Sequence, residues 1–192
     1  MKKVTLFAVA AFALFSFVKL ETSTWSSDNV HSNLGFTINH LGINDVHGQF
    51  NNYESKITAT KADFSDAVIE LSAETASIST GNTMRDDHLK TAEFFDAANN
   101  SKITFKSTSF IKGKDNNYKV EGDLTLHGVT NKVTLTAVYN GTTTHPMNKK
   151  SMAGFRIFGV IKRSDFKLAS TMPTAVISDE VKINADVEYS KN

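Results

Sequence analysis

Apolar residues recur at every second position along several segments of the chain. The alternating sets are Leu34, Phe36 and Ile38; Ile103 and Phe105; Val120, Leu124 and Leu126; Val133 and Leu135; Phe155 and Ile157; and Val181, Ile183, Ala185 and Val187. A period of two with one apolar face is typical of antiparallel strands packed on one side. We count about eight such strands, enough for a barrel that can hold one small ligand.

The segments between these strands are short and rich in turn residues. Gly128 to Lys132 and Lys112 to Asn117 each read as the link of a hairpin, and Thr142 to Lys150 reads as a longer loop. Consecutive hairpins predict an all-β fold, either an up-and-down antiparallel barrel or a meander. The alternation alone does not decide whether the inward faces form a packed core or line a narrow tunnel.

One segment departs from the strand pattern. A predicted strand with Ile69 and Leu71 on one face runs into a Ser/Thr-rich turn, after which the apolar spacing becomes helical. We predict a short helical insert over about residues 83–98, with Thr83 as N-cap and acidic residues in the first turn. Its apolar face would cover one end of the barrel or pack on its wall.

The chain begins with two lysines and an apolar run over residues 4–18. This run is short for a membrane span, which needs about 20 residues, and the order of basic, apolar and polar segments is typical of a secretory signal. We predict a signal peptide at residues 1–20, with its cleavage point open, and a single domain over residues 21–192. An uncleaved anchor is the alternative. The mature chain would have no stable membrane span.

Composition excludes several classes of protein. The chain has 21 Lys+Arg against 20 Asp+Glu, so its net charge of +1 gives no reason to expect a nucleic-acid partner. Because there is no cysteine, neither a lipid-modified thiol nor a disulfide can form. The six histidines show no metal-ligand spacing, and neither a G-x-S-x-G elbow nor a glycine-rich phosphate loop occurs.

Two polar clusters stand out from the strand pattern, Arg85 to His88 and Arg163 to Asp165. Helix capping and salt bridges would explain both. The alternative places Arg85, His88 or Arg163 at the mouth of the barrel, where they meet the polar head of a ligand, because the arginine fork suits phosphate and carboxylate groups.

Taken in order, the motifs along the chain resemble the YceI-like family, also called polyisoprenoid-binding or lipocalin-like. The resemblance covers nearly all of the mature chain. It rests on WSSDNVHS at 25–32, FTINHLG at 36–42, VHGQF at 46–50, ASISTGN at 76–82, RDDHL at 85–89, FFD at 94–96, ITFKST at 103–108, GDLTLHGVT at 122–130, AGF at 153–155, RSDF at 163–166 and DEV at 179–181. Two positions depart from the family pattern: Lys167 stands where Gly is usual, and Ser101-Lys102 stands where Pro is frequent.

The resemblance implies an extended, lipocalin-like, eight-stranded antiparallel barrel with a long apolar tunnel, export to the periplasm, and binding of a long-chain isoprenoid or other amphiphilic lipid. It implies no enzymatic activity, and we expect neither a cofactor nor a metal. It favours the tunnel over the packed core. The residues expected to bind the ligand are Leu34, Phe36, Ile38, His40, Ile69, Leu71, Arg85, His88, Phe105, Leu124, Leu126, Leu135, Phe155, Ile157, Arg163 and Ile183.

Two other functions stay open at this point. A stress-related interaction module would have a packed core and a contiguous exposed apolar patch. An enzyme acting on an amphiphile would need Asp28, His31, Ser32 and His40 to converge within hydrogen-bond reach. Exposed strand edges or the long loop could also allow a homodimer.

Overall fold

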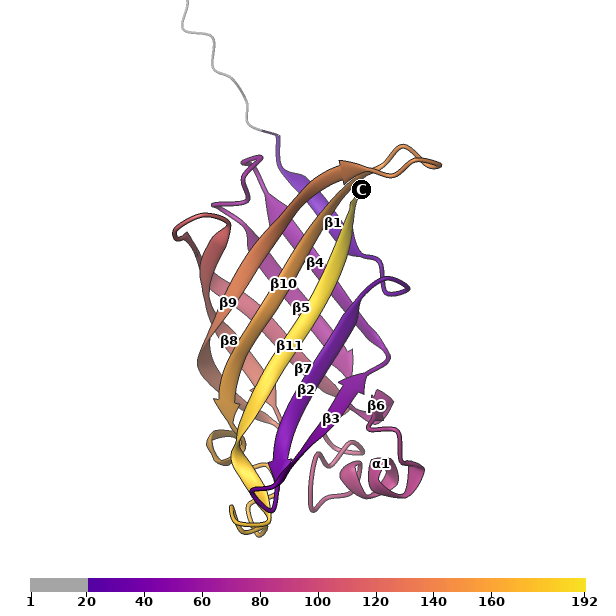
Figure 1. Ribbon diagram of the computed structural model, residues 1–192, viewed down its shortest axis with the longest axis vertical. Coiled ribbons are helices and arrows are strands. Elements are labelled where there is room, and N and C mark those ends of the chain that lie inside the picture. Colours follow the sequence, from indigo (N-terminus) through magenta and orange to yellow (C-terminus); the bar gives the residue numbers. More distant parts are fainter. Residues whose placement is uncertain (1–20) are drawn as a thin grey trace, which may run out of the picture.

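The computed structural model describes residues 21–192, so the predicted signal peptide lies outside the described residues. Eleven strands, one α-helix and two 3₁₀ turns make up this part of the chain (Figure 1). The elements are β1 (Ser23–Ser27), β2 (Asn33–His40), β3 (Asn44–Phe50), β4 (Tyr53–Ala59), β5 (Val68–Glu74), η1 (Thr75–Ser77), β6 (Ile78–Ser79), α1 (Thr83–Leu89), β7 (Lys102–Lys112), β8 (Asn117–Leu126), β9 (Val129–Thr144), β10 (Ser151–Lys162), η2 (Arg163–Phe166) and β11 (Ile177–Lys191). Within residues 21–192, no helix has the length and apolar character needed to cross a membrane.

Eight of these strands close an antiparallel barrel in the order β1-β4-β5-β7-β8-β9-β10-β11, with β11 returning to β1. The fold predicted from the alternation is therefore confirmed. One edge of β11 pairs with β10. Along its other edge, β11 pairs with β2 over Ile177–Asp186 and with β1 over Tyr189–Lys191. The strands β3 and β6 extend the sheet beyond β2, so the barrel is long and its end near α1 is built differently from the other (Figure 1).

The tight turn between β8 and β9 is shorter than predicted. It consists of His127 and Gly128 alone, and residues 129–132 already belong to β9. Both turn residues have positive φ, 51° and 73°, as a two-residue type I′ hairpin requires. His127 is an uncommon residue for such a φ, so the sequence carried only half of the usual turn signal.

The helical insert is also shorter than predicted. The helix α1 covers only Thr83–Leu89, and the chain up to β7 consists of turns. Its N-cap is Asn82, not Thr83, because the Asn82 side chain accepts a hydrogen bond from the backbone N–H of Arg85. The amide of Phe95 donates to the carbonyl of Leu89, so the segment after α1 folds back onto the end of the helix.

The core is divided into two clusters along the barrel. At the end away from α1, Phe64 from the β4–β5 connection enters the barrel and contacts Trp25, Tyr139 and Phe155, with ring centroids 5.2–5.4 Å apart. The second cluster, near α1, includes Phe50, Phe95 and Phe166. Aromatic side chains therefore close one end of the barrel, and the insert packs at the other.

Candidate functional site

Between the two clusters lies a cavity of about 560 Å³, within the range of sites that enclose small molecules. Inward-facing side chains from β2, β5, β7, β8, β9, β10 and β11 form its walls. Many of them, such as Leu34, Leu135 and Ile157, are only half-buried although they point into the barrel, because they border the cavity. This cavity contradicts the interaction-module alternative, which requires a packed core.

Fifteen of the sixteen residues expected to bind ligand line this cavity. They are Leu34, Phe36, Ile38, His40, Ile69, Leu71, Arg85, His88, Phe105, Leu124, Leu126, Leu135, Ile157, Arg163 and Ile183. Phe155 does not line it. Phe155 is fully buried between Phe64 and Tyr139, so it belongs to the aromatic cluster that closes the barrel.

The mouth of the cavity lies at the α1 end. The exposed residues among the lining are His40 and Asn44, which flank the β2–β3 turn, and Arg85 and His88 on α1. Arg85 donates from Nε to the Thr80 hydroxyl at 2.7 Å and from one terminal nitrogen to the Thr80 carbonyl at 2.8 Å. His88 lies 3.0 Å from Glu93 and packs edge-on against Phe94.

At the closed end, the cavity reaches a pair of buried hydroxyls. The hydroxyls of Ser55 and Tyr189 are 2.7 Å apart, and the Ser55 hydroxyl donates to the carbonyl of Glu70 at 3.2 Å. Burial raises the pKa of Tyr189 to about 12, so the phenol is neutral at physiological pH. These two groups satisfy each other, which leaves the closed end suited to an apolar tail.

Arg163 lines the cavity next to η2, on the side of the second core cluster near α1. Its side chain is only 4% exposed. It donates to five backbone carbonyls, those of Leu168, Ala169, Met172, Ile177 and Ser178, at 2.7–3.3 Å. Arg163 therefore holds the connection between η2 and β11 in place. Lys167, the departure from the family glycine, ends η2 in the left-handed region with φ 54°.

The expected ligand-binding set leaves out several lining residues, and two groups of these lie outside the strand alternation. The first comes from the insert and its neighbours and includes Phe50, Leu89, Phe94 and Phe95; the second comes from the η2–β11 connection and comprises Leu168, Ala169, Met172 and Val176. For the insert, the apolar helical face was a usable signal. The connection has no regular period, so only the tertiary contacts of Arg163 reveal that it faces the cavity.

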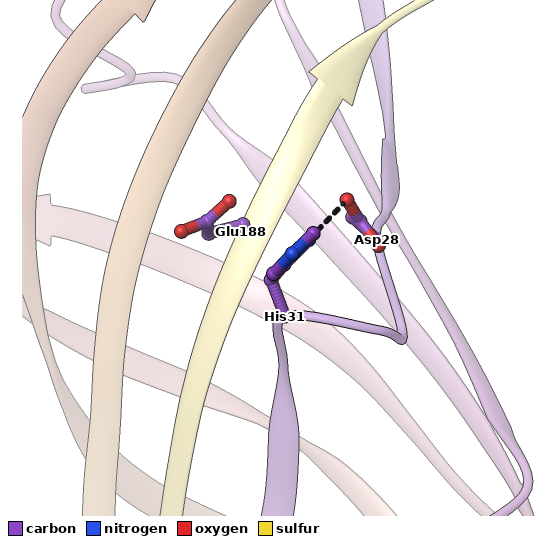
Figure 2. A group of neighbouring side chains, drawn as sticks. All are labelled: Asp28, His31 and Glu188. Carbon is purple, nitrogen blue, oxygen red and sulfur yellow. Dashed lines mark hydrogen bonds and ion pairs between the residues drawn. The ribbon is translucent and has the colours of Figure 1, made fainter. Parts of the chain in front are cut away.

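Asp28, His31 and Glu188 form a polar group outside the cavity, and their side-chain ligand atoms lie within 4.8 Å of one another (Figure 2). Asp28 accepts from His31 at 2.9 Å and from the amide of Val30 at 3.0 Å, so the turn between β1 and β2 accounts for its position. The hydrogen bond between Asp28 and His31 lowers the pKa of Asp28 and raises the pKa of His31. Nothing else in the described chain points to a metal at this group.

The four residues of the enzyme alternative do not converge. Asp28 and His31 pair, but the Ser32 hydroxyl accepts from the amide of Glu188 at 2.9 Å. His40 lines the cavity at the opposite end of β2, which is about 23 Å away along an extended strand. The arrangement therefore provides no nucleophile and base inside the barrel from these residues.

Comparison with known proteins gives a consistent result. A family profile described as a YceI-like domain matches residues 25–189. The UPF0312 protein SAB2563 of Staphylococcus aureus is 32% identical over 172 residues, which cover 88% of this chain and 98% of that protein.

Solved structures share the architecture. The YCEI protein of Campylobacter jejuni is 33% identical, with a TM-score of 0.73 over 86% of this chain and 96% of that one. A polyisoprenoid binding domain from Saccharophagus degradans is 18% identical, with a TM-score of 0.65 over 91% of this chain and all of that one, a likeness of fold.

Proposed function

The chain belongs to the YceI-like domain family, and we propose that it binds one long-chain isoprenoid or related amphiphilic lipid inside the barrel. The observation that carries the proposal is the cavity of about 560 Å³, whose walls are apolar and whose exposed lining residues gather at one end. A tail inside it would be stabilised by about 25 cal/mol per Å² of apolar surface removed from water.

The two ends of the cavity support one orientation of the ligand. The aromatic cluster around Phe155 closes one end, and the hydroxyls of Ser55 and Tyr189 beside it are already paired. The polar side chains Arg85 and His88 stand at the other end. The tail therefore points toward Tyr189 and the head toward α1. The polyisoprenoid-binding description of the Saccharophagus degradans domain, which shares the fold, agrees with this ligand class.

We further propose that the protein is an exported carrier which works in the periplasm without catalysis. The basic and apolar residues at the start of the chain support export. The separation of His40 from the Asp28–His31 pair supports binding without chemistry. Cell fractionation tests the location: recovery of the chain in the periplasmic fraction is expected, and recovery with the cytoplasm would contradict it.

Native mass spectrometry of the purified protein, followed by organic extraction, tests the binding function. We expect a stoichiometric long-chain amphiphile. The variant Val133→Trp fills the cavity from β9, whereas Thr134→Trp places the same side chain on the exposed outer face of that strand. The first variant should lose the lipid and the second should keep it. A mass that corresponds to the ligand-free protein, and that does not change after incubation with polyprenyl lipids, would contradict the proposal.

A further inference from the structure

The charges around the cavity have one sign. The ionisable side chains that line it are His40, Arg85, His88, Arg163 and Tyr189, and no carboxylate of residues 21–192 is among the lining. Tyr189 lies at the closed end and stays neutral because burial raises its pKa. The permanent charges at the cavity surface are therefore the two arginines, Arg163 beside η2 and Arg85 on α1.

Arg163 is a buried cation without a carboxylate partner. No salt bridge involves it within the part of the chain that the structure describes. Its five carbonyl partners satisfy its hydrogen bonds but carry no net charge. The carboxylate of Asp179, next to Ser178 in the sequence, accepts from the amide and hydroxyl of Ser164 and forms no ion pair with Arg163. Arg163 therefore places beside the low-dielectric cavity a positive charge that no direct ion pair within residues 21–192 compensates.

Arg85 has donors left over at the mouth. Two of its five N–H groups bind Thr80, and the others have no partner within residues 21–192. The neighbouring carboxylates are engaged elsewhere: Asp86 accepts from the amide and hydroxyl of Thr80, Asp87 pairs with Lys90, and Glu93 pairs with His88. A guanidinium with free donors at the edge of an apolar cavity is suited to an oxygen anion.

We infer that the ligand is an acidic amphiphile, whose carboxylate or phosphate head lies at the α1 end between Arg85 and Arg163. The inference rests on the proposed lipid-binding function and adds the charge of the head group. A neutral head would leave Arg163 without an ion-pair partner, and a cationic head would be repelled by both arginines. An anionic head is attracted by both and can accept the donors of Arg85 that remain.

The experiment compares three probes with one chain and different heads: geranylgeraniol, geranylgeranyl phosphate and geranylgeranoic acid. Binding to the lipid-free protein is measured by fluorescence competition at fixed ionic strength. We expect the phosphate and the acid to bind on the order of tenfold more tightly than the alcohol. Arg85→Gln should reduce this preference roughly threefold to fivefold, because the phosphate and the acid lose more affinity than the alcohol. Arg163 is unsuitable for the test, because its loss would disrupt the η2–β11 connection that it holds in place.

The matched control is Lys90→Gln, which removes one positive charge from the same insert at a residue that does not line the cavity. It should leave the preference intact. Equal or tighter binding of the alcohol, or equal effects of the Arg85 and Lys90 variants, would overturn the inference while the proposed function stands. Failure of all three probes to bind would overturn both. Displacement of geranylgeranyl phosphate by millimolar inorganic phosphate would assign the site to free phosphate and also overturn the inference.

Discussion

Tyr189 and Ser55 show how a polar pair is tolerated beside an apolar cavity. The Ser55 hydroxyl donates its one proton to the carbonyl of Glu70, so we assign the phenol of Tyr189 as the donor in their mutual hydrogen bond. The two residues therefore depend on each other unequally. Ser55 keeps a partner for its proton if Tyr189 is changed, but the Tyr189 proton has no second acceptor within the described chain.

This asymmetry predicts different costs for the two single substitutions. Ser55→Ala leaves a buried hydroxyl unsatisfied and should lower the free energy of unfolding by about 2 kcal/mol. Tyr189→Phe removes the donor and should cost about 1 kcal/mol. The double variant should cost less than the sum. Urea unfolding curves provide the measurement, and a larger cost for Tyr189→Phe would show that the donor assignment is wrong.

The Asp28–His31 pair makes the stability of the β1–β2 turn depend on pH. The pKa of His31 is raised above its ordinary 6.5, mainly by the hydrogen bond with Asp28. The stability that His31 contributes is therefore complete below pH 6.5 and is lost as the pH rises through the raised pKa. The pKa of Asp28 is lowered from 3.8, mainly by the hydrogen bond with His31. The stability that Asp28 contributes is therefore complete above pH 3.8 and is lost as the pH falls through the lowered pKa. The pair contributes fully between 3.8 and 6.5.

An NMR titration of the His31 ring measures this coupling directly. The midpoint should lie above 6.5 in the wild type and should fall in the Asp28→Asn variant, which cannot stabilise the imidazolium by a charge-assisted bond. Asp45→Asn, on β3 and outside this group, serves as the control and should leave the midpoint unchanged. A wild-type midpoint at or below 6.5 would refute the pairing.

The parity of strand residues predicted most cavity walls, but not where along the barrel each side chain lies. Phe155 and Ile157 share the inward face of β10, yet only Ile157 lines the cavity. The difference comes from Phe64, which enters the barrel from another connection and covers Phe155. Alternation along one strand fixes the face of a residue. The alternation does not predict where side chains from distant segments of the chain enter the barrel.

Within the strands, Gly122 of β8 marks a place where the sheet leaves no room for a side chain. A Cβ at this position would lie 2.5 Å from the carbonyl oxygen of Lys106 and 2.5 Å from the ring of Phe105, a cavity-lining residue. Gly122→Ala should therefore destabilise the barrel by about 2 kcal/mol through overpacking. Thermal and urea unfolding report this cost.

Gly154 of β10 is the matched control, because a Cβ there would meet its nearest neighbour, the Asn140 Cβ, at an ordinary 3.4 Å. Gly154→Ala should change the free energy of unfolding by less than about 0.5 kcal/mol. Equal losses in the two variants would mean that general strand flexibility, and not the contact with Phe105, decides the effect.

The connections between elements were the least predictable part of the site. The strands and the helical insert follow from period and from capping residues, although the N-cap is Asn82 and the β8–β9 turn is His127–Gly128. The η2–β11 connection follows from neither. Its shape depends on five carbonyls that converge on Arg163, and backbone carbonyls carry no sequence signature.

The barrel as a whole is a hydrogen-bonded shell around a hollow middle. Its two aromatic clusters and its closed strand order hold the ends, so the shell does not depend on a filled interior to stay closed. The half-buried residues that line the cavity lack packing contacts on the side that faces it. A bound tail would supply these contacts, which couples the stability of the fold to the occupancy of the cavity.

Removal of co-purified lipid should therefore lower the melting temperature without unfolding the protein. A ligand present at about a hundred times its Kd adds about 2.7 kcal/mol. For a domain of this size that corresponds to a shift of roughly 5–10 °C. Calorimetry of lipid-bound, stripped and reloaded samples measures the shift, which reloading should restore. In Val133→Trp, where the indole occupies the cavity, stripping and reloading should have no effect. An unchanged melting temperature in the stripped wild type would mean that the lining gains nothing from the ligand, and burial of a tail could not then drive binding.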